Sequence, residues 1–201
     1  MNSWEQISTD LDGKAAGDQS GNSVSISGDG TIVAVGAYAN DDNGNIAQGL
    51  TRIYKYSSGS WDQLGNDIYG DNFQTIDPTD YHFIQTGIVN LSSDGTVVAI
   101  GGNYLGDKVR IYKYSSGSWN QLGDDFQVIR KRMAGRYISL SADGTIVAIG
   151  GKDAQTVNGR KSGHTRIYQY TSGSWNQLGN DIEGEAADDE SGYSVSLSAD
   201  G

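Results

Sequence analysis

The stretch RIYKYSSGSW, from Arg52 to Trp61, is repeated within this chain of 201 residues. The same ten letters return from Arg110 to Trp119, and a close copy, RIYQYTSGSW, runs from Arg166 to Trp175. Trp4 and the three tryptophans that close these copies are separated by 57, 58 and 56 residues. A period of this length indicates that one supersecondary unit is copied along the chain and stacks on its neighbours.

Each repeat is predicted to contain four short β-strands, because runs rich in Val, Ile, Tyr and Thr alternate with clusters of Gly, Ser, Asp and Asn. In the first repeat these strands, named A to D, are SVSIS (23–27), TIVAVGA (31–37), TRIYKY (51–56) and SWDQLG (60–65). The S-x-D-G-T link between A and B and the Y-S-S-G-S-W link between C and D suit hairpin turns, in which glycine takes a positive φ. Since no stretch shows a sustained helical period, the sequence predicts an all-β protein.

Four-stranded antiparallel units of this length, each with a short-turn side and a long-loop side, are typical of β-propeller blades. The stretches SGNSVSISGDGTIVAVGA (20–37) and SGYSVSLSADG (191–201) resemble the FG-GAP repeats of the integrin α-subunit propeller and related surface proteins. The resemblance covers the whole chain and implies a β-propeller of about 3.5 blades per chain, each of four antiparallel strands. It also implies an extracellular or cell-surface location, which nothing else in the sequence addresses.

Calcium-binding members of that family carry a long acidic loop between strands A and B. Here that turn has shrunk to Gly28-Asp29-Gly30, Ser93-Asp94-Gly95 and Ala142-Asp143-Gly144. A lone carboxylate cannot supply the roughly six to eight oxygens that Ca²⁺ requires. Calcium is the cofactor that the family resemblance makes possible. Because no intact loop motif is present, the sequence predicts no cofactor and no metal site.

The chain is predicted to be a single repeat domain, 1–201, that is out of register with whole blades. Its predicted parts are a partial D strand (1–22), blade 1 (23–69), blade 2 (84–126), blade 3 (136–182) and a partial blade 4 (183–201). An arc of blades exposes strand edges that invite pairing with another chain. Two copies total about seven repeats, a common propeller size, so a seven-bladed homodimeric ring is the leading assembly hypothesis. The alternative is that the chain is one part of a longer propeller, natural or engineered.

The charge balance bears on the kind of partner. Fourteen basic and 25 acidic side chains give a net charge of −11 and a pI near 4.4. Such a chain repels phosphate backbones, so no nucleic-acid partner is predicted. Its apolar runs are too short for a bilayer, so no membrane insertion is predicted either. Because cysteine is absent, the redox compartment cannot be deduced.

Functional residues are expected on the long-loop side, formed by the B–C and D–A connections, because function concentrates in variable loops on a rigid scaffold. Asp41 and Asp42 belong to an acidic group there, which suits a divalent cation or a cationic partner, or is simply a solvated rim. Basic residues gather in the third repeat, where they suit an anionic ligand, a glycan, the acidic loops of a second copy, or scattered surface charge. They are Arg130, Lys131, Arg132, Arg160 and Lys161.

An insert in the second repeat, GDNFQTIDPTDYHF (70–83), concentrates aromatic side chains. Exposed aromatics suit glycan stacking or a protein hot spot, whereas the simpler interpretation is that the rings fold over the end of the core. The aromatic candidates are Phe73, Tyr81, His82 and Phe83. The tryptophans recur at one place in strand D, so they are interpreted as structural residues that pack each blade on its neighbour. They are Trp4, Trp61, Trp119 and Trp175.

Catalytic motifs are not evident. His82 and His164 are the only histidines, they lie in different repeats, and neither has an acidic residue at metal-motif spacing. There is no G-x-S-x-G elbow and no phosphate-binding glycine loop. The sequence therefore predicts that the chain is not an enzyme but a binding or assembly module that mediates protein interaction or adhesion. A lectin-like propeller is the alternative, and a fragment of a larger propeller hydrolase is the second alternative.

Overall fold

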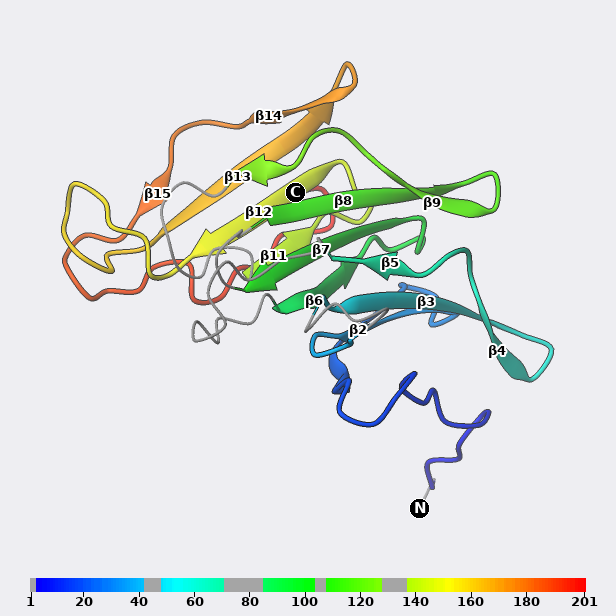
Figure 1. Ribbon diagram of the computed structural model, residues 1–201. Helices are drawn as coiled ribbons and strands as arrows, with labels where there is room; N and C mark the ends of the chain where they lie inside the picture. Colours follow the sequence, from blue (N-terminus) through cyan, green and yellow to red (C-terminus); the bar gives the residue numbers. More distant parts are fainter. Residues whose placement is uncertain (1–2, 42–47, 71–84, 104–107, 128–136) are drawn as a thin grey trace.

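The structure is a computed structural model that describes residues 3–41, 48–70, 85–103, 108–127 and 137–201 (Figure 1). Within these ranges no helix occurs, and the strands form three antiparallel sheets, one for each repeat. The all-β prediction and the propeller-type fold class are therefore confirmed. No helix in the described part of the chain is long and apolar enough to span a membrane.

Each sheet follows the predicted order A–B–C–D along the chain. The first sheet, blade 1, contains β1 (Ser20–Ile26), β2 (Ile32–Ala37), β3 (Leu50–Ser57), β4 (Ser60–Gln63) and β5 (Ile68–Tyr69). Blade 2 contains β6 (Gln85–Leu91), β7 (Val97–Asn103), β8 (Lys108–Ser115), β9 (Ser118–Gln121) and β10 (Phe126–Gln127). Blade 3 contains β11 (Tyr137–Leu140), β12 (Ile146–Gly151), β13 (His164–Thr171), β14 (Ser174–Gln177) and β15 (Ile182–Glu183).

The two-residue strands β5, β10 and β15 were not predicted. β5 pairs with the beginning of β3, while β4 pairs with its end, so the outer strand of the blade is interrupted between Gln63 and Ile68. The interruption holds Gly65, whose φ of 79° favours glycine. The outer strand is thus longer than the sequence pattern indicated, with a break in the middle.

The A–B turn is held by its aspartate. In blade 1, Ser27 Oγ donates to Asp29 Oδ1 at 2.7 Å, and the Thr31 amide donates to the same oxygen at 2.9 Å. The Thr31 amide and then the Ser27 hydroxyl lower the pKa of Asp29. Asp94 and Asp143 make the same contacts in their turns. The S-x-D-G-T phrase is therefore a turn motif.

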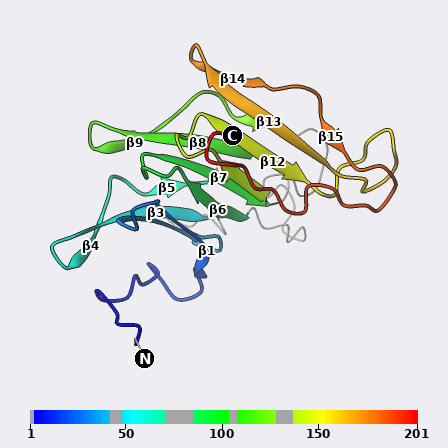
Figure 2. The same cartoon turned by 180° about the vertical axis from the view of Figure 1, so that it is seen from behind.

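The blades stack through repeated contacts between successive A strands. Backbone bonds link the A–B turns, from Gly28 N to Ser93 O (2.7 Å), Ser93 N to Ala142 O (2.8 Å) and Ala142 N to Ala199 O (2.8 Å). The last of these shows that residues 194–201 lie on blade 3 as the A strand of a further blade would. Figure 2 shows this segment, in red, running back beside blade 3.

Side chains of the A strands continue the same contacts. Ser25 Oγ accepts from the Leu91 amide at 2.9 Å, and Ser139 Oγ accepts from the Leu197 amide at the same distance. Between blades 2 and 3, Asn90 Oδ1 accepts from Leu140 N at 2.7 Å. A polar side chain at one position of strand A therefore satisfies a backbone amide of the next blade at each of the three junctions.

The tryptophans join the outer parts of the blades. Trp119 Nε1 donates to the Leu64 carbonyl of blade 1 at 2.7 Å, and Trp175 Nε1 donates to the Leu122 carbonyl of blade 2 at 2.8 Å. Trp119 is buried, whereas Trp4 is fully exposed. Trp119 and Trp175 thus each bond to the blade before their own, and Trp4 does not share their surroundings.

Apolar side chains fill the spaces between the sheets. One core cluster joins Ile53 and Ala34 of blade 1 to Val89 and Val98 of blade 2. A second joins blade 2 to blade 3. Ile53 is fully buried. The N-terminal segment, residues 3–19, lies on the face of blade 1 that points away from blade 2 (Figure 1).

Replacing Trp119 by alanine is expected to lower the free energy of unfolding by about 3–5 kcal/mol, because it empties a buried aromatic site between two blades. Trp119→Phe keeps most of the packing and loses the bond to Leu64, at a cost of about 1 kcal/mol. Urea unfolding followed by circular dichroism measures both. Trp4→Ala is the control and should change stability by less than about 0.5 kcal/mol; equal losses at the two positions would contradict the assigned contact.

Candidate functional site

Most of the predicted site residues lie outside the described part of the chain, so the interpretations attached to them stay predictions. These residues are Asp42, Phe73, Tyr81, His82, Phe83, Arg130, Lys131 and Arg132. Asp41, Arg160 and Lys161 are described. Asp41 is exposed at the start of the B–C connection of blade 1, whereas Arg160 and Lys161 lie in the B–C connection of blade 3.

Arg160 and Lys161 face acidic residues of their own chain. Lys161 Nζ lies 3.7 Å from Asp153 Oδ1 and 3.6 Å from Glu190 Oε1. Arg160 Nη2 lies 3.7 Å from Asp188 Oδ1, with both side chains largely exposed. The positive charge that suggested an anionic ligand at this loop is therefore balanced locally, by Asp153 of the same loop and by Asp188 and Glu190 on the connection that follows β15.

Lys152 completes a four-membered charge cluster that sequence reasoning missed. Its Nζ lies 3.0 Å from Asp153 Oδ2 and 3.6 Å from Glu190 Oε2, and it sits over the Tyr193 ring, 5.7 Å from the centroid. The hydrogen bond with Asp153 is the main cause that raises the pKa of Lys152. A comparison of the repeats could have singled out Lys152, because the equivalent position after β2 of blade 1 holds Tyr38 and not a charged residue.

Backbone hydrogen bonds fasten the two loops of this cluster together. The amides of Asp188, Glu190 and Ser191 donate to the carbonyls of Arg160, Lys161 and Ser162, each at 2.9 Å. We call the combined surface, residues 152–164 and 183–193, the loop platform. It is held by main-chain bonds as well as by its charges, so its shape does not depend on the ion pairs alone.

Several residues of the loop platform adopt left-handed backbone conformations. Lys161, Asp188 and Glu190 have φ values of 53°, 64° and 52°. Such conformations cost a non-glycine residue roughly 1–2 kcal/mol. The docked backbone offsets that cost, and the surrounding structure therefore determines the shape of these loops.

The exposed side chains of the loop platform are of mixed character. Val157 is 93% exposed at a loop tip, and Tyr193 is 58% exposed while its ring contacts Tyr137 at a centroid distance of 5.0 Å. The Arg160 and Asp188 side chains, at 76% and 62%, lie between loop and solvent. The platform thus offers an aliphatic group, an aromatic ring and both signs of charge on one rigid surface.

His164 is the last residue of the first loop of the platform and the first residue of β13, and it is 5% exposed. Burial is the main cause that lowers its pKa, followed by the charge of Arg166. His164 is therefore neutral at pH 7. Among the described residues, no group of three or more His, Cys, Asp or Glu side chains could hold a metal ion.

An arginine–aspartate clamp recurs in all three blades. Arg110 Nε and Nη2 donate to the two oxygens of Asp125 at 2.8 and 3.0 Å, a bidentate geometry. Arg52 pairs with Asp67, and Arg166 with Asp181, in the same way. Because each clamp ties the C strand to the break in the outer strand, we assign it a structural role.

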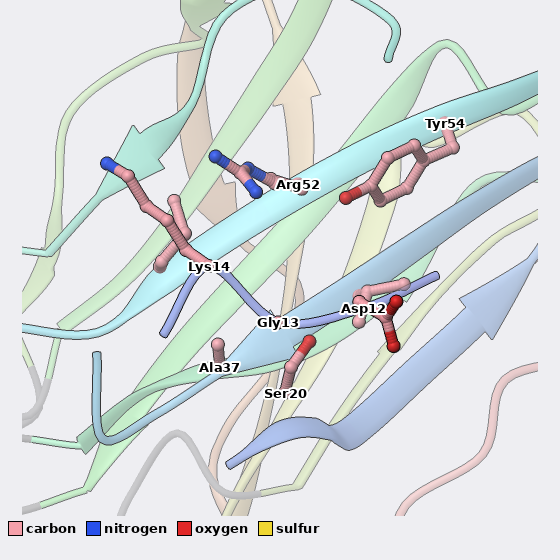
Figure 3. A pocket seen from close by; sticks show the side chains of 9 residues that line it. Asp12, Gly13, Lys14, Ser20, Ala37, Arg52 and Tyr54 are labelled. Carbon is pink, nitrogen blue, oxygen red and sulfur yellow. The ribbon is translucent and has the colours of Figure 1, made fainter. Parts of the chain in front are cut away.

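A small cavity lies between the N-terminal segment and blade 1. It is lined by Asp12 and Lys14 from the segment and by Arg52 and Tyr54 from β3, with Ser20 from β1 nearby (Figure 3). Its volume is about 10 Å³, room for roughly one water molecule. Lys14 Nζ donates to the Tyr69 hydroxyl at 2.9 Å and so holds the segment in place. This cavity is a packing gap and too small for an organic ligand.

Comparison with known proteins supports the family resemblance. Residues 6–50 match the FG-GAP repeat family, which confirms the resemblance predicted from the sequence. No curated protein matches the chain.

Solved structures share the fold at low sequence identity. A protein of Bacteroides fragilis named as a 6-phosphogluconolactonase is 16% identical, with a TM-score of 0.52, and the match covers 82% of this chain and 39% of that one. A counterpart from Bacteroides uniformis is 14% identical, with a TM-score of 0.52, and the match covers 82% of this chain and 41% of that one. The periplasmic gluconolactonase of Pseudomonas aeruginosa is 15% identical, with a TM-score of 0.51, and the match covers 82% of this chain and 39% of that one. This chain therefore spans about two fifths of the length of these structures.

The names of these structures correct one prediction. The sequence was interpreted as that of a protein without enzymatic activity, whereas the matching structures are named as lactonases, which are enzymes. The prediction rested on a search for local motifs. A propeller brings loops from separate blades to one face, so residues far apart in the sequence can share a site without forming a motif. The expectation of a non-enzyme is withdrawn.

Lowering the pH should weaken the arginine–aspartate clamps. Arg110, as the main cause, holds the pKa of Asp125 well below its ordinary value. Stability from this pair is complete above the unfolded-state pKa of about 3.9 and is lost as the pH falls from there toward the folded-state pKa. Asp125→Asn should cost about 1.5–3 kcal/mol at pH 7 and flatten the loss of stability below pH 4. Urea unfolding between pH 7 and pH 2 measures this.

The neighbouring Asp124 provides the control for that experiment. Its side chain is exposed, so Asp124→Asn should leave both the stability and its pH dependence close to those of the parent chain. The same acid slope in the parent and in Asp125→Asn would show that the clamp does not carry the pH dependence.

Proposed function

Taking residues 6–50 as an FG-GAP repeat, we propose that this chain contributes a protein-binding surface to a β-propeller, and that the loop platform is that surface. The observation that carries the proposal is the backbone docking of residues 188–191 onto residues 160–162. Rigid loops bind with a smaller loss of conformational entropy than mobile ones. The platform is thus preorganised for a partner.

The exposed groups favour a protein partner over a small molecule. Tyrosine and arginine are enriched at protein interfaces, and Tyr193 and Arg160 are exposed on the loop platform, as Val157 is. A platform with both positive and negative charges favours a partner whose charges are arranged in the complementary pattern, and it speeds the association of that partner. Adhesion at a cell surface is the setting that the FG-GAP resemblance suggests for such an interaction.

A display library of small proteins, selected against the immobilised chain, tests this proposal. Binders are expected to lose at least about tenfold in affinity for a Val157→Asp, Arg160→Glu double variant, since each tenfold corresponds to about 1.4 kcal/mol and an exposed hot spot is worth more. Surface plasmon resonance measures the affinity.

Lys55 and Lys113 supply the matched control, because both are exposed on C strands away from the loop platform. A Lys55→Glu, Lys113→Glu double variant should bind as the parent does. Selected binders that tolerate the platform variant but not the control would place the binding surface elsewhere.

Sugar-lactone hydrolysis is a second candidate function, favoured by the names of the structures that share the fold. The loop platform offers Glu190 as a partly exposed carboxylate for proton transfer, next to two lysines that can stabilise negative charge. On this proposal the chain contributes its platform to an active site that further loops of the propeller complete.

Hydrolysis of δ-gluconolactone, followed in a pH-stat, tests the second candidate. The rate is expected to exceed that of buffer, and Glu190→Gln is expected to reduce the excess at least about a hundredfold if Glu190 is the proton-transfer group. Glu185→Gln, also on the platform, is the control. A rate equal to that of buffer would remove this candidate and leave the binding proposal in place.

A further inference from the structure

In the part of the chain that the structure describes, the face of blade 1 that points away from blade 2 lacks the contacts that the other blade junctions make. Val24 and Ile26 of β1 are 62% and 58% exposed, whereas Val89 and Leu91, at the corresponding positions of β6, are 5% and 7% exposed. The difference arises because blade 1 covers β6, and no described part of the chain covers this side of β1 in the same way. The exposed residues are those that a blade junction buries.

The glycines of the A–B turns also show that this face of blade 1 is open. A Cβ added at Gly95 would lie 2.7 Å from Ile32, and one at Gly144 would lie 2.7 Å from Val97, because each turn glycine packs on the blade before it. Gly30 holds the same position in the first A–B turn, yet a Cβ there would meet nothing within 4 Å. Blade 1 thus has the shape of a junction surface whose partner is absent.

The N-terminal segment already covers the outer half of this face. Tyr56 donates its hydroxyl proton to the Ile7 carbonyl at 3.1 Å, and residues 12–14 lie over β2 and β3. The inner half, along β1, is not covered by any described residue. At the junction between blades 1 and 2 the corresponding half of β6 lies against β1 and β2, and β1 supplies the polar bonds.

Residues 194–201 have the matching surface. They are docked on blade 3 in the position of an A strand, and Ser194 and Ser196 are exposed on them. The sequence of 194–198, SVSLS, differs from SVSIS at 23–27 in one letter. Ser23 and Ser25, at the equivalent positions, accept hydrogen bonds from the amides of Val89 and Leu91 at 3.0 and 2.9 Å.

From this match we infer that the open face of β1 receives residues 194–201 of a second copy of this chain. Ser194 and Ser196 then accept from the amides of Val24 and Ile26, and the Ala199 amide donates to the Gly28 carbonyl. That last bond continues the series that runs from Gly28 through Ser93 and Ala142 to Ala199 within one chain. The contact is head-to-tail, so copies add in one direction and either close into a ring or continue.

The occupant is a second copy because the required surface is the chain's own junction surface. The open face needs hydroxyl acceptors at alternate positions of one strand and an amide donor at the following turn, as the junction between blades 1 and 2 has. Residues 194–201 supply both in the right order. The inference uses β1 and residues 194–201, neither of which belongs to the loop platform, and does not depend on the proposed function.

Sedimentation velocity at increasing concentration tests the inference on the full chain. The mass is expected to rise from 21.4 kDa to a multiple of it. Ile26→Asp should weaken association at least tenfold, because it places a charge in the junction. Lys113→Glu, a change of charge at an exposed residue outside both surfaces, should leave association unchanged. A chain that stays at 21.4 kDa at every concentration overturns the inference.

Cross-linking identifies the surfaces without relying on a destabilising substitution. The chain has no cysteine, so single thiols can be placed at will. A Ser196→Cys chain mixed with a tagged Ile26→Cys chain is expected to give a mixed dimer with a short bismaleimide, and a Val157→Cys chain in place of either is expected to give none. Efficient linkage through residue 157, with association that survives Ile26→Asp, would place the interface elsewhere and overturn the inference.

Discussion

The backbone contact between successive blades is the constraint on which the rest of the structure depends. Gly36 of β2 lies against Gly87 of β6 so closely that a Cβ added to Gly36 would fall 1.8 Å from the Gly87 carbonyl oxygen. Gly150 and Gly192 repeat the contact between blade 3 and the segment after it, at 2.2 Å. Any side chain at Gly36 or Gly150 would force the sheets apart. Glycine at these positions therefore sets the distance between blades, and every other contact between blades is possible only at that distance.

The remaining junction contacts extend outward from this joint. Close to it, Ser25 reaches the Leu91 amide, and farther out Ile53 and Val98 fill the space between the sheets. At the rim, the Trp119 ring bonds to the Leu64 carbonyl of the blade before it. The arginine–aspartate clamps act within a blade and hold the interrupted outer strand in the position that the next tryptophan needs. From the inner strands to the outer edge, each junction thus contains a backbone contact, then a polar hydrogen bond, then apolar packing, and finally a tryptophan at the rim.

The fold was largely predictable from the sequence because its signals are local and repeated. The phrases around Asp29 and Trp61 mark turns and strands whose chemistry acts within a few residues. The loop platform was not predictable, because Glu190 comes from the connection after β15. It meets Lys152 and Lys161, which lie in the connection between β12 and β13, only through the stacking of blade 3 on the segment after it. The break after Gln63 was missed for a related reason, since nothing in the period distinguishes one long strand from two short ones. The absence of enzymatic activity was inferred from missing motifs, which are local signals for a property that a propeller assembles from several blades.

A chain built of repeats has a further property: every junction surface exists in several copies, and in this structure one of them faces outward. In this chain the outward surface lies on β1, where Ile26 is exposed although Leu91 and Leu140 at the same position are buried. The opposite surface lies on residues 194–198, whose sequence is nearly that of β1 itself. The chemistry that makes one blade recognise the next does not depend on whether both belong to one polypeptide. Selection for stable stacking within the chain therefore also produces a surface that another copy can recognise, whereas the loop platform, which differs from the other loops, is free to recognise something else.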